Sequence, residues 1–343
     1  MWRSRPRLFR HRRGRRRSIF LSVCMTCGAK ITGSGTFVKV WAKSVLVLLG
    51  ILGLTGCSLG PPAPIVVFCS PEGSRVQQAV EGLKAGLEGA GPLEVVWARG
   101  AGEEAREQLR QIRRRHPRLL VVFGTPALML VAPEEKRLPL VFALVGDPYF
   151  TGGAYDAAHP ELHQENLTGI ASPAPVAAAL EQGAGLLGPR TWGLIFDPND
   201  GVAAELKDAF LQEASKFGVK PLAASSTDAS GDRRGLEELR SQGARVFYLP
   251  PAPSAARYAP RLLAWGRQGQ VAVVSSLPEG EQQGALLWIA LDYRALGREA
   301  AALARRLLAG EKPPAIPIIT RTPLRIEVDE ALLRRWSDYP APH

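Results

Sequence analysis

The fold is decided by residues 119–148, LLVVFGTPALMLVAPEEKRLPLVFALVGDP, in which two apolar runs rich in β-branched residues each end in a turn-forming cluster. The clusters at 124–126 and 146–148 both consist of Gly, a polar residue and Pro. A continuous apolar run is typical of a strand buried on both faces, as in a parallel sheet covered by helices. Thr125 precedes Pro126 in the pattern of a helix N-cap and its first helical residue. The stretch therefore predicts helix N–H groups at the carboxyl edge of a parallel sheet, where open α/β sheets bind small ligands.

The same alternation of apolar runs and amphipathic segments extends in both directions from this stretch. Because such alternation is typical of right-handed βαβ units, it predicts an α/β protein with two doubly wound parallel-sheet lobes. The predicted strands are 65–69, 93–98, the two runs of the opening stretch, 191–196, 219–224, 245–249 and 271–275. The predicted helices are 75–88, 103–116, 176–187, 202–217, 232–242, 257–268 and 293–308.

Between the two series lies the polar and irregular segment 149–165, which we interpret as the first passage from one lobe to the other. This division assigns 65–170 and 285–315 to lobe I. Residues 171–284 and 316–336 are assigned to lobe II. The remaining parts are a basic extension with a signal peptide at 1–56, a Pro-rich tether at 57–64 and a tail at 337–343.

The formal net charge of +11 is typical of a protein that binds nucleic acid, but its location argues against that function. Residues 1–56 contain 12 Lys and Arg and no Asp or Glu, so the rest of the chain has 31 basic against 32 acidic residues. The basic excess therefore belongs to a leader and not to the folded body. We expect no nucleic-acid partner.

The leader ends with the features of a secretory signal peptide. Two lysines precede the apolar residues 45–54, which are too few to span a bilayer, and Leu-Thr-Gly-Cys follows at 54–57. This sequence resembles the bacterial lipobox, in which the cysteine is diacylated and becomes the mature N-terminus. The resemblance implies that Cys57 carries lipid and tethers the protein to the periplasmic side of a bacterial membrane without crossing it. Ser58 after the cysteine favours the outer membrane if the source is Gram-negative.

Residues 1–37 precede this signal peptide and contain one isolated C-x-x-C pair at 24–27. A single pair of this kind is weak evidence for a zinc site. We expect translation to begin near Val38. The mature chain would then have only Cys57 and Cys69, which provide no disulfide framework once Cys57 is lipidated.

Polar side chains follow most of the predicted strands, at the edge where a ligand would bind. Thr125 and the amides of its helix could hold a carboxylate, and Asp147 could pair with an ammonium or hydroxyl group. Alternatively, Thr125 is only a helix cap and Asp147 only forms a turn before Pro148. The candidate ligand-binding residues are Ser70, Glu72, Thr125, Asp147, Asn199, Asp200, Ser225, Ser275 and Ser276.

Signatures of an enzyme are weak or missing. The sequence GAGLLG at 183–188 has the G-x-G-x-x-G spacing, but it closes a helix and precedes a strand, the reverse of the dinucleotide-binding context. No G-x-S-x-G elbow or P-loop occurs, and no histidine has an evident nucleophile as partner. We therefore expect a protein that is not an enzyme and has no cofactor and no metal site.

Several segments, in their order and spacing, resemble the extracytoplasmic ABC-transporter substrate-binding protein family that includes the tryptophan- and tyrosine-binding lipoproteins. The segments are GTPA at 124–127, PLVFALVGDP at 139–148, NLTGIAS at 166–172, LDYRALGREAAALARRLLAGEKP at 291–313 and the lipobox. The resemblance covers nearly all of 65–336. It implies a type I periplasmic-binding-protein fold, with two α/β lobes joined by three crossings and a ligand enclosed between them by hinge motion.

The resemblance implies a monomeric, lipid-anchored receptor that captures a small polar, amino-acid-like ligand and presents it to the permease of an ABC importer. One loop departs from the family pattern, because residues 250–253 read PPAP where the family commonly has an acidic or amide residue. This departure favours an alternative function, in which a lipoprotein of the same fold regulates or scaffolds enzymes of the cell envelope.

Overall fold

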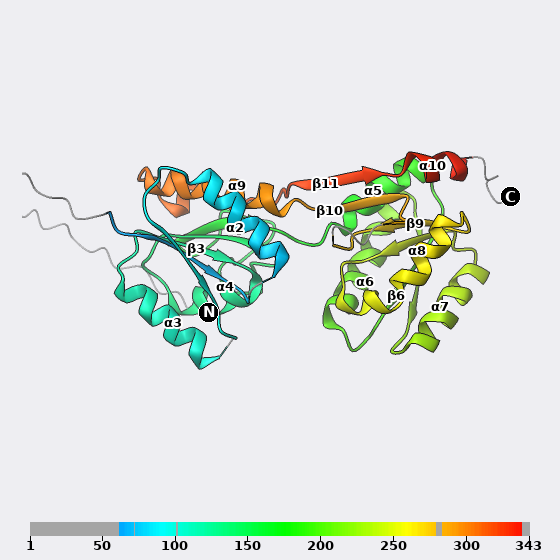
Figure 1. Ribbon diagram of the computed structural model, residues 1–343, viewed down its shortest axis with the longest axis horizontal. Coiled ribbons are helices and arrows are strands. Elements are labelled where there is room, and N and C mark those ends of the chain that lie inside the picture. Colours follow the sequence, from blue (N-terminus) through cyan, green and yellow to red (C-terminus); the bar gives the residue numbers. More distant parts are fainter. Residues whose placement is uncertain (1–61, 72, 101, 279–282, 338–343) are drawn as a thin grey trace, which may run out of the picture. The chain divides into compact units, whose positions relative to one another are not determined.

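The apolar runs form two sheets built mainly of parallel strands, in a computed structural model that describes residues 62–71, 73–100, 102–278 and 283–337 (Figure 1). The predicted α/β fold class and the two series of strands and helices are confirmed. Element boundaries differ from the predicted ones by a few residues, as expected where helix ends fray. None of the helices within these ranges is long and apolar enough to cross a membrane.

The first sheet has the strand order β2-β1-β3-β4-β5, and all of its neighbouring strands pair in parallel. Its strands are β1 (Ile65–Cys69), β2 (Leu93–Trp97), β3 (Leu119–Phe123), β4 (Leu140–Val145) and β5 (Leu167–Ala171). The helices that connect or cover them are α2 (Ser74–Gly86), α3 (Glu103–Arg114), α4 (Thr125–Glu134) and α9 (Tyr293–Leu308).

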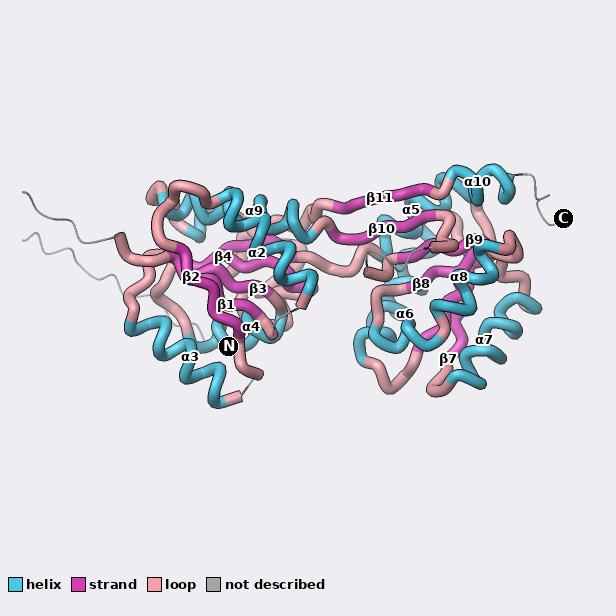
Figure 2. The backbone as a smooth tube through the Cα atoms, in the orientation of Figure 1, coloured by secondary structure: helices cyan, strands magenta, loops and turns pink. Residues whose placement is uncertain are grey.

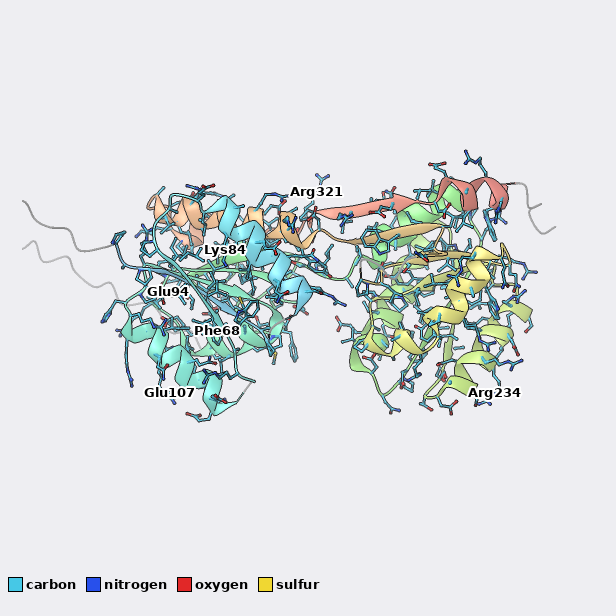
Figure 3. The ribbon with its side chains drawn as sticks, viewed as in Figure 1. Phe68, Lys84, Glu94, Glu107, Arg234 and Arg321 are labelled. Atoms are coloured by element: carbon cyan, nitrogen blue, oxygen red, sulfur yellow. The ribbon has the colours of Figure 1, made fainter. Side chains whose placement is uncertain are left out.

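Alternate residues of β1 point into two different cores, which explains why this strand is apolar throughout. Val67 packs with α2 and α9 on one face of the sheet, whereas Phe68 packs with α3 and α4 on the other. Phe68 lies inside the lobe, while Glu107 on α3 points outward (Figure 3). Cys69 is fully buried in the first of these cores, and burial raises the pKa of its thiol to about 12. It is therefore an unreactive apolar filler.

The second sheet has the strand order β11-β10-β9-β8-β6-β7. Its strands are β6 (Thr191–Phe196), β7 (Lys220–Ser225), β8 (Val246–Leu249), β9 (Ala272–Ser275), β10 (Leu287–Leu291) and β11 (Leu324–Val328). All pair in parallel except β11, which is half-exposed and runs antiparallel to β10 (Figure 2). The helices of this lobe are α5 (Val176–Leu187), α6 (Gly201–Ala214), α7 (Ala229–Ser241), α8 (Ala259–Arg267) and α10 (Glu330–Ser337).

The predicted assignment of 285–315 to lobe I is wrong for its first part. Strand β10 lies in the second sheet, where it pairs with β9 and β11. Only the helix that follows, α9, joins the first lobe. The apolar sequence of β10 is compatible with either sheet. Its pairing partners are distant in sequence, so the local pattern does not show which sheet the strand joins.

The predicted assignment of 316–336 to lobe II is wrong for residues 316–319. Ile316 and Ile318 are buried in the two cores of the first lobe. The N–H of Ile319 donates to the carbonyl of Gly169 at 2.9 Å, and its carbonyl accepts from the N–H of Ala171 at 2.9 Å. The segment therefore extends the first sheet beside β5 before the chain returns to β11.

The irregular segment 149–165 is not the first passage between the lobes, because it folds back on the first lobe. Gln164 Nε2 donates to the carbonyls of Ala132 and Gly152, and Asn166 Nδ2 donates to that of Glu135. The chain first leaves this lobe after β5. It returns between β10 and α9 and leaves again between residues 319 and 324, which gives the predicted three crossings.

Helix α9 returns to the first lobe by packing directly on α2, and the two helices lie side by side (Figure 1). The contact is so close that glycine is required on both helices. A Cβ on Gly297 would overlap the carbonyl oxygen of Ala79, and one on Gly82 would overlap the carbonyl of Arg294. Arg294 also pairs with Glu81 at 2.5 Å on the exposed side of this contact.

We predict that Gly297→Ala lowers the free energy of unfolding. Overpacking of this kind costs about 1–3 kcal/mol, against a gain in helix propensity of about 1 kcal/mol. Denaturant unfolding measures the difference. The matched control is Gly185→Ala at an exposed position of α5, where a Cβ meets nothing within 4 Å and stability should stay the same or rise. Equal stability of the two variants would contradict the close helix contact.

Candidate ligand-binding site

A cavity of about 350 Å³ lies at the carboxyl ends of strands from both sheets. Its lining comes from the segments that follow β1, β3, β5, β8 and β9, from Leu144 within β4, from the first turns of α6 and from the β10–α9 junction. The lining residues are Ser70, Arg75, Val76, Gly124, Thr125, Pro126, Leu144, Ser172, Ala174, Pro175, Val202, Leu206, Pro251, Ser276, Ala290, Leu291 and Tyr293. This is the edge at which α/β proteins bind ligands, and the volume suits a small molecule.

The start of α4 forms one wall of the cavity. Gly124 is its N-cap residue and has a φ of +97°, a conformation that favours glycine. Thr125, predicted to be the N-cap, is instead the first helical residue, and no side chain of the N-cap position accepts a hydrogen bond. Ser70 supplies the acceptor from the end of β1, because its Oγ accepts the N–H of Ala127 at 3.3 Å. A Cβ on Gly124 would collide with this Oγ.

Two further helices begin at the cavity without a side-chain cap. The N-cap of α2 is Gly73 and that of α5 is Pro175, and neither side chain can accept a hydrogen bond. In contrast, α6 is capped by Asp200, whose Oδ1 accepts the N–H groups of Val202 and Ala203. Uncapped helix starts present partial positive charge, so the cavity favours an anionic group.

The one formal charge among the described lining residues is also positive. Arg75, in the first turn of α2, lies beside the hydroxyl of Tyr293 at the start of α9. Burial raises the pKa of Tyr293 and the neighbouring guanidinium opposes this shift, so the phenol stays neutral at physiological pH. The described residues of the lining include no Asp or Glu.

Leu144 lines the cavity from β4 in an unusual conformation. Its φ is +59°, and the pairing of β4 with β5 shifts register between Phe142 and Val145. A left-handed conformation is costly for a non-glycine residue, and such strain is concentrated at binding sites. The half-buried Leu144 side chain gives the cavity an apolar surface.

Three of the nine candidate binding residues line this cavity: Ser70, Thr125 and Ser276. Ser276 is 3% exposed, and its Oγ accepts a hydrogen bond from the Tyr248 hydroxyl at 3.2 Å. The sequence did not single out Arg75, Leu144 or Tyr293. Arg75 could have been found as a cation in the first turn of the helix after strand 65–69, whereas nothing local marks Leu144 or Tyr293.

The other candidates lie elsewhere, and Glu72 lies outside the described residues. Asp147 is exposed and its Oδ1 accepts the N–H groups of Tyr149 and Phe150, so it forms the turn. Asn199 donates its N–H to Asp197 Oδ1 at 2.9 Å. The remaining three are Asp200, which caps α6, Ser225, which is exposed on β7, and Ser275, which is fully buried in β9.

The loops at the carboxyl edge of the second sheet are joined by an ionic cluster. Arg257, at the end of the short helix 253–257, donates from Nη1 to Asp197 Oδ2 at 2.6 Å and from Nε to Asp232 Oδ2 at 3.1 Å. Its Nη2 also donates to the carbonyl of Ser226. The hydrogen bond from Arg257, helped by the N–H of Asn199, lowers the pKa of Asp197. The carboxylates of Asp197 and Asp232 therefore have a structural role, because both are paired with Arg257.

We predict that Arg257→Gln destabilises the protein at neutral pH, because it leaves Asp197 and Asp232 without their cation. The pKa of Asp197 is lower in the folded chain than the unfolded value of about 3.9, so its stabilisation is present above that pH. It is lost as the pH falls through the folded pKa. The stability difference between wild type and variant should therefore shrink below about pH 4.

Denaturant unfolding at a series of pH values measures this difference. Arg233→Gln is the matched control, because Arg233 forms an exposed pair with Glu237 in the same lobe and its loss should cost at most about 0.5 kcal/mol. A difference between wild type and Arg257→Gln that is constant from neutral to acid pH would contradict the assigned role of the cluster.

No group of three His, Cys, Asp or Glu side chains in the described ranges is arranged to hold a metal ion.

Comparison with known proteins identifies the family of the chain. Residues 64–331 match the family described as ABC transporter substrate binding protein. A search of curated proteins finds no match.

Solved structures resemble the chain at low sequence identity, which by itself shows the fold alone. A ligand-free, open substrate-binding protein with adhesive properties from Clostridium difficile is 19% identical, covers 81% of this chain and 96% of its own, and has a TM-score of 0.65. The ABC domain in complex with L-Trp from Streptococcus pneumonia is 18% identical, covers 80% and 94%, and has a TM-score of 0.56. The glucose-galactose binding protein GanP from Geobacillus stearothermophilus is 15% identical, covers 82% and 100%, and has a TM-score of 0.53. The family match over most of the chain, together with this fold, shows that the protein belongs to the ABC transporter substrate-binding protein family.

Proposed function

We propose that this protein is a lipid-anchored extracytoplasmic receptor that captures a small polar ligand with a carboxylate group, as amino acids have. It then presents the closed complex, as a monomer, to the permease of an ABC importer. The observation that carries this proposal is the cavity itself. Three helix starts whose N-cap residues provide no side-chain cap meet there with Arg75 at the carboxyl ends of the strands.

The cavity has the groups that an affinity in the micromolar range requires. Such an affinity corresponds to about −8 kcal/mol. Each hydrogen bond to a charged group contributes about 1.5–3 kcal/mol, so a carboxylate held by Arg75, Thr125 and helix amides reaches much of this value. The apolar side chains of Val76 and Leu206 would bury the rest of the ligand.

The three crossings support a hinge. They run through residues 172–175, 291–292 and 320–323, and each of these segments is short. Two lobes joined in this way can close over a ligand, and the relative from Clostridium difficile is described as ligand-free and open. Closure would bury the ligand and create the surface that the permease recognises.

The lipid anchor is proposed from Cys57, which lies outside the described residues. Lipidation there would hold the receptor at the periplasmic side of a membrane, with the outer membrane favoured in a Gram-negative cell. The tether 57–64 would separate the anchor from β1, the first strand of the fold.

We predict that Cys57→Ser releases the protein from the membrane fraction, because the variant cannot be acylated. Cell fractionation followed by mass spectrometry of the mature N-terminus measures this. The matched control is Cys69→Ser, a buried cysteine that should leave membrane attachment unchanged. A Cys57→Ser variant that stays in the membrane fraction would refute the anchor.

We predict that a bound ligand raises the melting temperature and that Gly124→Ala abolishes this effect. A ligand at 100 times its Kd stabilises the folded chain by about 2.7 kcal/mol. A Cβ on Gly124 is strained at its positive φ and displaces Ser70 Oγ from the start of α4. Thermal shift in a library of amino acids, organic acids, nucleosides and sugars gives the measurement.

Gly152→Ala is the matched control for Gly124→Ala. Gly152 also has a positive φ, of +74°, but a Cβ there meets nothing within 4 Å and does not reach the cavity. This variant should bind ligand as the wild type does. If no compound in the library raises the melting temperature of the wild type, the receptor function is wrong and a scaffold or regulator of envelope enzymes is favoured instead.

A further inference from the structure

A surface of the first lobe that does not line the cavity has the features of a protein interface. It is formed by the segment between β4 and β5, in which residues 153–155 pair with 162–164 as a short antiparallel hairpin. We infer that this surface docks a partner protein whose contact surface presents lysine or arginine side chains around an apolar recess. We call the surface the hairpin patch, and its residues are Asp147, Phe150, Tyr155, Asp156, Glu161 and Leu162. None of these six residues lines the cavity, so the inference goes beyond the proposed capture of a ligand.

Three large apolar side chains of the hairpin patch are exposed to solvent. Phe150 is 75% exposed, Tyr155 is 65% exposed and Leu162 is 48% exposed. They are the most exposed large apolar side chains in the part of the chain that the structure describes. Single exposed apolar side chains are common on protein surfaces, but several within one short segment indicate an interaction surface.

The pairing of the hairpin puts two of these side chains on the same face. The N–H of Tyr155 donates to the carbonyl of Leu162 at 3.0 Å, and the preceding residue Ala154 pairs with His163. Residues opposite each other in an antiparallel pair point to the same side, whereas neighbours along a strand point to opposite sides. Ala154 and His163 are therefore buried against the lobe, and Tyr155 and Leu162 face solvent.

The backbone of the hairpin is held by hydrogen bonds to the rest of the first lobe. The carbonyl of Pro160 accepts the N–H of Ile318 at 2.9 Å. Gln164 Nε2 donates to the carbonyl of Ala132 at 3.1 Å. The exposed side chains are therefore presented by an ordered segment. A preorganised surface loses little conformational entropy when it binds, which favours a docking role.

The hairpin patch is also acidic. Its segment, 147–165, has no Lys or Arg and four exposed acidic residues, which are Asp147, Asp156, Glu161 and Glu165. Burial raises the pKa of Tyr149, and both Asp147 and Asp156 add to this increase, so the two carboxylates lie near the same phenol. The N–H of Glu161 and the ring of His159 lower the pKa of Glu161, and Asp156 opposes this decrease. Three neighbouring carboxylates therefore give the patch a negative potential.

The charge and the aromatic rings together favour a basic protein as the partner. Carboxylates attract lysine and arginine, and a guanidinium group over the ring of Phe150 or Tyr155 would gain a cation–π interaction. An anionic membrane surface would be repelled by the same carboxylates. A second copy of the chain, joined through the same patch, would bring like charges into contact.

The test measures binding of fluorescently labelled peptides by fluorescence anisotropy. The protein is the chain from residue 57 onward, which lacks the basic leader and retains every described helix and strand. The probe is an amphipathic helical peptide of leucine and arginine, and the control peptide has glutamate in place of each arginine. We expect the arginine peptide to bind about tenfold more tightly or better, with an affinity that falls as salt is added. Equal affinities for the two peptides overturn the inference.

A double variant then locates the binding surface. Asp156→Asn combined with Leu162→Ser should weaken binding of the arginine peptide by about tenfold or more, because it removes a charge and an apolar contact. The matched control makes the same two changes on α6, Asp208→Asn with Leu211→Ser, and should leave the affinity within about twofold. All four side chains are exposed, and circular dichroism checks that both variants are folded. Equal loss in the two variants overturns the inference.

Two further measurements distinguish the partner from other occupants of the patch. Wild type and the Asp156→Asn, Leu162→Ser variant are compared for binding to phosphatidylglycerol vesicles and for oligomeric state by sedimentation. We expect no vesicle binding and a monomer in both. Vesicle binding or a dimer that the variant abolishes would overturn the inference, because the occupant would then be a membrane or a second copy. The variant should keep any ligand-induced rise in melting temperature, so failure of the docking surface is distinguishable from failure of the receptor function.

Discussion

Parallel strands impose the main constraint on this protein, because they force every helix that follows a strand to begin at the same edge of the sheet. In the first sheet all five strands run in one direction, so α2 and α4 both start where β1 and β3 end. The first N–H groups of a helix have no partner inside that helix. This edge must therefore satisfy them with side chains, solvent or a ligand. The cavity lies where side chains do not satisfy them.

The two lobes meet this constraint in different ways. The second lobe uses its carboxylates within its own structure: Asp200 and Asp228 cap α6 and α7, and Asp197 and Asp232 pair with Arg257. The first lobe instead begins α2, α3 and α4 with glycine, and a neighbouring Ser70 provides one acceptor for α4, whereas α9 is capped by Asp292. Within the described residues, the carboxylates of the second lobe are therefore occupied by its own structure, and the starts of α2 and α4 have no acidic cap. The positive electrostatic potential of the cavity follows from this distribution of charged groups and not from the net charge of the chain.

The return of α9 to the first lobe determines which residues complete the cavity. The glycines of α2 and α9 allow the two backbones to touch, which places Tyr293 beside Arg75. Both residues then line the cavity, although more than 200 positions separate them in sequence. A contact that serves packing thus also fixes the polar end of the site.

The sequence by itself determined the strands, the helices and the two-lobe α/β fold, because buried parallel strands are long apolar runs that can be recognised locally. It also marked the edge of the sheet at Gly124 and three lining residues, Ser70, Thr125 and Ser276. Only the tertiary structure decided which sheet takes β10, where residues 316–319 pack and that Asp147 serves a turn rather than the cavity. The physical reason is that three features depend on residues distant in sequence. They are the pairing of a strand, the packing of α9 on the first lobe and the hydrogen-bond partner of each carboxylate. A local pattern shows that a group needs a partner, but it does not show which one the folded chain provides.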